Sequence, residues 1–199
     1  MNELEIRVNV GNNCGLFLNN KNELDIANEW ELLSNYPVTI EILKHQDEEM
    51  DDESNGEVVA TLNGIFFDIE YIENFGIPLF EIFDSIDQSV YELYEALFKG
   101  DWYKEEFEIY NPNLFYLTDI SVKDKEKDRY YREILINNLD DILKYVAKLN
   151  VGLIATEAYI VAEDDESNDD SILEAKGLLV DNDYIFATED ENYLIKEIL

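Results

Sequence analysis

The sequence predicts an α/β fold of the α+β type, in which helices flank one mixed β-sheet. Segments with the two-residue period of half-buried strands alternate with segments of helical period. Three successive strands are followed by a strand–helix–strand unit, which pairs in parallel, whereas the strands of a meander pair antiparallel. With 199 residues, 46% of them hydrophobic and 13% aromatic, the chain can bury one sizeable core. We therefore expect a single domain over residues 1–199.

The first half of the chain predicts a strand, a helix and a hairpin. Residues 3–10 alternate apolar and polar side chains, as a half-buried strand does. Residues 22–35 place apolar side chains at helical spacing and end shortly before a proline. Residues 38–43 and 57–72 are rich in β-branched and aromatic side chains and are separated by an acidic segment ending in Asn-Gly. That dipeptide favours a tight turn, so these two strands should form an antiparallel hairpin.

The second half predicts a helical insert and then the strand–helix–strand unit. Two short helices fit the periodicity of an insert at approximately residues 77–100. The central strand at 114–122 precedes the most regular helix of the chain, at 131–149, in which Asp140 can pair with Lys144 one turn later. The remaining predicted elements are a buried strand, a short helix and two closing strands, at residues 151–162, 172–179, 184–188 and 193–199.

The charge composition narrows the possible partners. The chain has 47 acidic and 14 basic residues and a formal net charge of -33, which excludes general affinity for nucleic acid, because that binding depends on lysine and arginine. An acidic surface favours basic partners. The single cysteine cannot form a disulfide within the chain and indicates a reducing compartment. The sequence has neither a signal-peptide pattern nor a long apolar run, so we expect a cytoplasmic protein with no membrane association.

A basic segment interrupts the acidic chain between the central strand and the long helix. Five of the 14 basic residues fall within residues 123–132. Cations at a helix N-terminus are unfavourable unless an anion or a carboxylate neutralises them. One interpretation is anion binding through Lys125, Lys127, Arg129 and Arg132. The other, which we favour, is ion pairing with the abundant carboxylates of the chain itself, since such pairs are common.

The element order, together with LFEIFDSIDQSVYELYEALF followed by LFYLTDISV, resembles the GNAT acetyltransferase superfamily. The resemblance spans roughly residues 37–199. Within the superfamily, the sequence is similar to a bacterial subgroup that has a helical insert before the central strand. It implies a GNAT-like mixed sheet and a turn after that strand that cradles the pyrophosphate of acetyl-CoA. The superfamily motif reads Arg or Gln, two residues, Gly, one residue, then Gly or Ala. Small residues there let backbone N–H groups approach the phosphates closely.

The turn departs from that motif. With Arg129 in the first position, the two small positions become Arg132 and Ile134, and with Lys127 they become Tyr130 and Arg132. Large side chains fill the cradle in either alignment. The residues that the resemblance places at the cofactor are therefore those of a degenerate turn, and we predict no bound cofactor. These residues are Lys127, Arg129, Tyr130 and Arg132.

If the protein is an enzyme, the resemblance implies an acetyl-CoA-dependent N-acyltransferase. Superfamily members often use a tyrosine after the last helix as the acid beside the departing thiolate, and Tyr184 occupies that region. Glu70 or Asp119 could serve as the base only if burial raises its pKa. His45 is the only histidine, and the chain lacks a Cys/His set for zinc, so we predict no metal site.

Two functions are compatible with these observations, and we favour the first. It is a catalytically inactive, acidic GNAT-fold binding protein, a pseudoenzyme that imitates nucleic-acid phosphates and occupies a basic protein surface, as phage or bacterial anti-defence inhibitors do. That surface would belong to a nucleic-acid-binding protein. The alternative is an N-acyltransferase that uses acetyl-CoA on a cationic small molecule or peptide. The predicted partner-binding residues are Asp47, Glu48, Glu49, Asp51, Asp52, Glu53, Glu81, Asp84, Asp87, Glu92 and Glu95.

Overall fold

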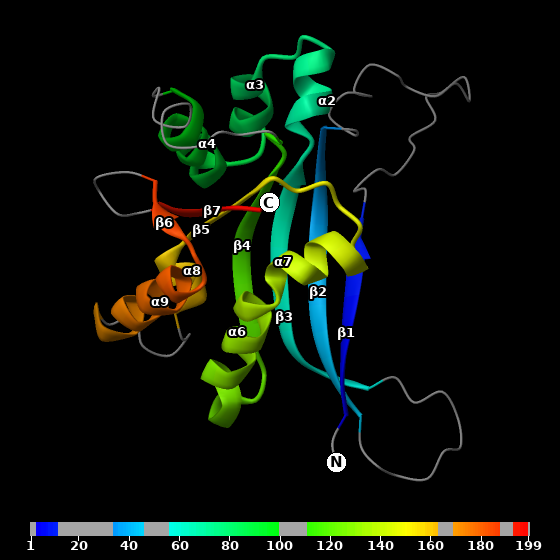
Figure 1. Cartoon of the computed structure of the whole chain (residues 1–199), viewed down its shortest axis with the longest axis vertical. Coiled ribbons are helices and arrows are strands. Elements are labelled where there is room, and N and C mark those ends of the chain that lie inside the picture. Colours follow the sequence, from blue (N-terminus) through cyan, green and yellow to red (C-terminus); the bar gives the residue numbers. More distant parts are fainter. Residues whose placement is uncertain are drawn as a thin grey trace, which may run out of the picture.

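A computed structural model describes residues 3–11, 34–45, 56–99, 111–162, 169–187 and 193–198. A seven-stranded sheet with the order β1-β2-β3-β4-β5-β7-β6 forms its centre (Figure 1). Strands β4 and β5 pair in parallel and all other neighbours pair antiparallel, which confirms the predicted mixed sheet of an α+β fold. The strands are β1 (Glu3–Val10), β2 (Asn35–His45), β3 (Glu57–Phe67), β4 (Leu114–Val122), β5 (Leu153–Glu157), β6 (Ile185–Phe186) and β7 (Tyr193–Glu197).

Helices cover both faces of the sheet. Before β4 comes the predicted helical insert, α2 (Ile69–Asn74), α3 (Leu79–Asp84), α4 (Gln88–Tyr94) and the π-helix η2 (Glu95–Lys99). After β4 come the 3-10 helix η3 (Lys125–Lys127), α6 (Asp128–Asn137), α7 (Leu139–Asp141) and the π-helix η4 (Ile142–Val146). Short helix α8 (Ala158–Val161) and α9 (Asp169–Asp181) follow β5. Among the described helices, none is long and apolar enough to cross a membrane.

Two apolar cores lie on opposite faces of the sheet. In one core, Phe83 of the insert stacks on Phe67 of β3, and Tyr116 of β4 belongs to the same core. The other core joins α6, α7 and α9 to the sheet and contains Leu135 and Leu179. Figure 1 shows the insert gathered at one end of the sheet, where β4 begins. The alternation of side chains along β4 therefore decides which helices each residue contacts.

The insert begins earlier than predicted. The run that was expected to be a strand to residue 72 ends at Phe67, and residues 69–74 form α2. The carboxylate of Asp68 caps this helix, because its Oδ1 accepts the backbone N–H of Tyr71 at 2.9 Å. Local capping thus outweighs the β-propensity of the following residues.

The region predicted as one helix at 131–149 forms three shorter helical elements, α6, α7 and η4. Helix α6 ends at Asn137, and the side chain of Asn138 donates to the carbonyl of Ile134 at 2.7 Å. Such a side-chain bond replaces the helical pattern locally. Asp140 of α7 pairs with Lys196 of β7 at 2.5 Å, a partner that the sequence analysis did not name.

The strand predicted for residues 151–162 ends at Glu157, and the following residues form α8. The parallel ladder between β4 and β5 has only three pairs, from Leu114↔Leu153 to Tyr116↔Ala155, and the ladder with β7 ends at Glu157↔Tyr193. Beyond that point no neighbouring strand in the described residues offers hydrogen bonds. The backbone N–H and C=O groups therefore hydrogen-bond to one another in a helix. This helix, α8, lies against β4 where β4 and β5 diverge.

Candidate functional site

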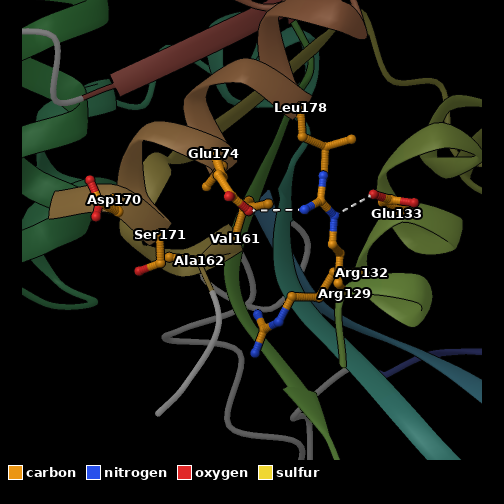
Figure 2. A pocket seen from close by; sticks show the side chains of 10 residues that line it. Arg129, Arg132, Glu133, Val161, Ala162, Asp170, Ser171, Glu174 and Leu178 are labelled. Carbon is orange, nitrogen blue, oxygen red and sulfur yellow. Dashed lines mark hydrogen bonds and ion pairs between the residues drawn. The ribbon is translucent and has the colours of Figure 1, made fainter. Parts of the chain in front are cut away.

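Two arginines of the basic segment, Arg129 and Arg132, form internal ion pairs. Nε of Arg132 lies 2.6 Å from Oδ2 of Asp128, and the two side chains are only 2% and 6% exposed. Arg132 also donates from Nη1 to the carbonyl of Ile160 in α8 at 3.3 Å. Arg129 is exposed and bridges Glu133, at 2.9 Å, and Glu174 of α9, at 3.1 Å (Figure 2).

Large and acidic side chains occupy the place of the predicted phosphate cradle. Asp128 is the first residue of α6, where a carboxylate complements the positive end of the helix dipole. Tyr131 and Arg132 are buried at 1% and 2% exposure, whereas Tyr130 is 51% exposed and Lys127 is exposed. Of the four predicted cofactor-binding residues, Arg129 and Arg132 line one cavity, whereas the side chains of Lys127 and Tyr130 are exposed. Oδ1 of Asp128 is buried and accepts no hydrogen bond within the described part of the chain.

A cavity of about 290 Å³ separates α6 from α8 and α9 (Figure 2). Its apolar wall includes Val161 and Leu178. Three carboxylates and two arginines supply its charges, and Arg129 spans it through the two ion pairs described above. A polyanion entering here would face these carboxylates. The charged lining residues are Arg129, Arg132, Glu133, Asp170 and Glu174.

The three predicted catalytic residues lie in separate environments. Tyr184 is 2% exposed, and its hydroxyl has no hydrogen-bond partner among the described residues. Burial raises the pKa of Tyr184, and the charge of Asp140 adds to this effect. Glu70 and Asp119 are both exposed, so the burial that we required of a base is absent. Asp119 instead accepts a hydrogen bond from Asn63 at 3.1 Å on the surface of the sheet.

The predicted acidic residues of the insert are exposed or half-buried on α3, α4 and η2. Asp87 caps α4 by accepting the backbone N–H of Val90 at 2.9 Å. Glu95 is bonded to Lys99 and Tyr91, and these two hydrogen bonds lower the pKa of its carboxyl. The other predicted acidic stretch, residues 47–53, lies outside the described residues. In the described part of the chain, no group of three or more His, Cys, Asp and Glu side chains is arranged to hold a metal ion.

A carboxyl group that the sequence analysis missed lies where β4 and β5 diverge. Oε1 of Glu157 accepts the hydroxyl of Tyr116 at 2.8 Å and that of Tyr159 at 3.3 Å. Burial raises the pKa of Glu157 against these hydrogen bonds, and the charges of Glu92 and Asp87 raise it further. Nearby, the hydroxyl of Tyr193 donates to a backbone carbonyl of α4 at 3.2 Å.

The sequence contains little indication that Glu157 would form such a site. Glu157 was placed inside a longer strand, and its neighbours come from β4, β7, α4 and α8, which are far apart in the sequence. The one available clue was the two-residue alternation, which places Glu157 on the same face of the sheet as Leu153 and Ala155.

Comparisons with known proteins leave the family open. No protein-family model matches the chain, and no curated protein matches it. Among solved structures, the chain is similar at 8% sequence identity and a TM-score of 0.42 to a chain in the crystal structure of the KacTA-DNA complex, covering 98% of this chain and 93% of that chain. A likeness at this TM-score carries no argument about fold or function.

Proposed function

We propose that the protein is a catalytically inactive, acidic binding protein with a GNAT-like fold that docks on a basic protein surface in the cytoplasm. The order of the sheet, an antiparallel meander followed by the parallel pair β4 and β5, supports the resemblance. The observation that carries the proposal is the buried ion pair of Asp128 with Arg132 at the start of α6. It occupies the position where the resemblance places the pyrophosphate of acetyl-CoA.

The energetics of this pair oppose cofactor binding. A pyrophosphate that recruited Arg132 would leave Asp128 buried without its partner, and breaking a buried pair costs about 3–5 kcal/mol. A micromolar ligand gains only about 8 kcal/mol in total. In addition, α8 lies against β4 and is joined to Arg132 through the carbonyl of Ile160. A helix of the chain itself thus lies beside β4 in the region where the two strands diverge.

The insert supplies the proposed docking face. Between residues 69 and 99 the sequence has seven acidic residues and one basic residue, Lys99, whose ammonium is bonded to Glu95. Complementary charge speeds the encounter with a basic partner and disfavours acidic ones. A nucleic-acid-binding protein fits this chemistry, because its binding surface is built to receive rows of negative charge.

Calorimetric titration with acetyl-CoA tests whether the protein is catalytically inactive because it does not bind the cofactor. We expect no heat of binding at low or at physiological salt, because the ion pair and α8 block the cofactor. Micromolar binding that persists at physiological salt would overturn the proposal and favour the N-acyltransferase with a cationic acceptor.

A displacement assay tests the docking face. We expect the protein to release labelled duplex DNA from protamine, an arginine-rich protein, with the release read by fluorescence anisotropy. A variant in which three exposed acidic residues of the insert are replaced by lysine should release DNA roughly tenfold or more less effectively. The three residues are Glu81, Asp84 and Glu92. The control reverses three exposed acidic residues of η3, α7 and α9, with the same change in net charge; these are Glu126, Asp141 and Asp181. Equal loss in both variants would refute the insert as the docking face, and no release by the unaltered protein would refute a basic partner.

A further inference from the structure

Glu157 forms a partly accessible site with three tyrosines, which we call the Glu157 site: Tyr116, Glu157, Tyr159 and Tyr193. Both hydroxyl donors bind the same carboxylate oxygen, Oε1, and this fixes the orientation of the carboxyl group. No hydrogen bond reaches Oε2 within the described residues. Tyr116 and Tyr193 are buried at 2% and 6% exposure, whereas Tyr159 is 53% exposed, so solvent reaches the site from the α8 side.

Within the described residues, the groups that act most strongly on Glu157 and the tyrosines around it are acidic or tyrosyl. They are Tyr116 on β4, Tyr193 on β7, Tyr159 on α8, Glu92 on α4 and Asp87 at the N-cap of α4. Neither lysine nor arginine is among the groups that act most strongly on this carboxyl group in the described part of the chain. The site therefore offers a cation one carboxylate and the hydroxyl oxygens of tyrosines.

We propose that the Glu157 site binds one alkylammonium group, as carried by a lysine side chain of the basic partner. This inference rests on the proposed function, because Tyr193 of the site donates a hydrogen bond to a backbone carbonyl of α4 in the acidic insert. An ammonium group has three donors and no acceptor, and it matches the open Oε2 together with hydroxyl oxygens whose hydrogens already bind Oε1. Arginine fits less well, because a guanidinium group prefers both oxygens of a carboxylate and Oε1 is occupied twice.

Binding should depend on pH in one direction. An ammonium group favours the ionised form of Glu157, whereas burial and the charges of Asp87 and Glu92 favour the protonated form in the free protein. Affinity should therefore increase as pH rises through the pKa of Glu157 in the free protein. Over the same pH range, binding should release a proton, and calorimetry in buffers of different ionisation enthalpy can count it.

The test titrates the full chain with n-butylammonium, the analogue of a lysine side chain, and with neutral n-butanol as the control ligand. Tyrosine ring resonances report binding. We expect Glu157→Gln to weaken n-butylammonium binding roughly ten- to hundredfold, since a hydrogen bond to a charged group is lost. Tyr159→Phe, an exposed position where folding is not at risk, should weaken it roughly threefold to tenfold. The control variant Glu126→Gln, on η3, should bind like the unaltered protein.

Three results would overturn the site: no n-butylammonium binding, equal binding of n-butanol, or unchanged affinity in Glu157→Gln that folds normally. Further ligands distinguish the source of the ammonium group. A lysine side chain is supported if a lysine peptide competes with n-butylammonium and its Nε-acetylated form does not. A free diamine is supported instead if 1,5-diaminopentane binds more than roughly tenfold tighter than the monoamine and the peptide fails to compete. Because protamine release depends on Glu81, Asp84 and Glu92, the Glu157 site can fail while the docking face stands.

Discussion

Removing the charge of Asp128 should destabilise the protein far more than removing an exposed partner on the same helix. In Asp128→Asn, Arg132 stays buried at 2% exposure and loses its carboxylate partner at 2.6 Å. Breaking one side of a buried pair costs about 3–5 kcal/mol. A chain of this length loses about 2–4 °C of melting temperature for each kcal/mol, so the expected decrease is roughly 6–20 °C.

Equilibrium unfolding in guanidinium chloride, followed by fluorescence, measures this loss. Arg129→Gln is the matched control, since Arg129 is exposed and exposed ion pairs contribute about 0–1 kcal/mol. The double variant Asp128→Asn with Arg132→Met should recover much of the loss, because it removes the uncompensated charge. A decrease below about 1 kcal/mol in Asp128→Asn would refute the claim that a buried pair organises the turn, and with it the energetic barrier to a phosphate ligand.

Three further predictions concern positions on the sheet and next to it. Tyr184→Phe should leave stability unchanged or raise it in the same unfolding assay, because the buried hydroxyl that it removes has no partner among the described residues. Gly64→Ala should cost about 1–3 kcal/mol, since a Cβ there would lie 2.3 Å from the ring of Phe115. Because the folded state raises the pKa of Glu157, this group stabilises the protein fully below its unfolded pKa and less as pH rises through the folded pKa. The free energy of unfolding of Glu157→Gln should therefore not decrease in this way as pH rises. Unfolding curves measured across the acidic pH range would detect the difference.

The elements that the sequence predicted well are those whose pattern is local. Alternation in residues 3–10 and the β-branched and aromatic runs that begin at residues 38 and 57 identified β1 and the β2–β3 pair, because the two-residue period is a local signal. The helical insert and the parallel β4–β5 pair followed from periodicity and element order. Boundaries failed where a single side chain decided them, as Asp68 does at the start of α2.

The site residues were harder to predict because their environments are made by distant segments. Asp140 pairs with Lys196 of β7, which lies far along the chain, and the setting of Glu157 is made by residues of β4 and the insert. Ion pairing with carboxylates of the chain itself was predicted for the basic segment, and Arg129 and Arg132 form such pairs. The burial of the pair formed by Asp128 and Arg132 was not predicted, because it depends on how α6 packs beside α8.

The distribution of basic residues explains why the insert is the better place for a basic partner. Nine of the 14 basic residues lie between residues 123 and 196, in or next to the elements that follow β4. There arginines already neutralise carboxylates, as Arg129 does for Glu133 and Glu174. The insert, on the opposite face of the sheet, has only Lys99 against seven acidic residues. A basic surface approaching the protein is therefore expected to gain most at the insert, where Lys99 is the one basic residue within residues 69–99.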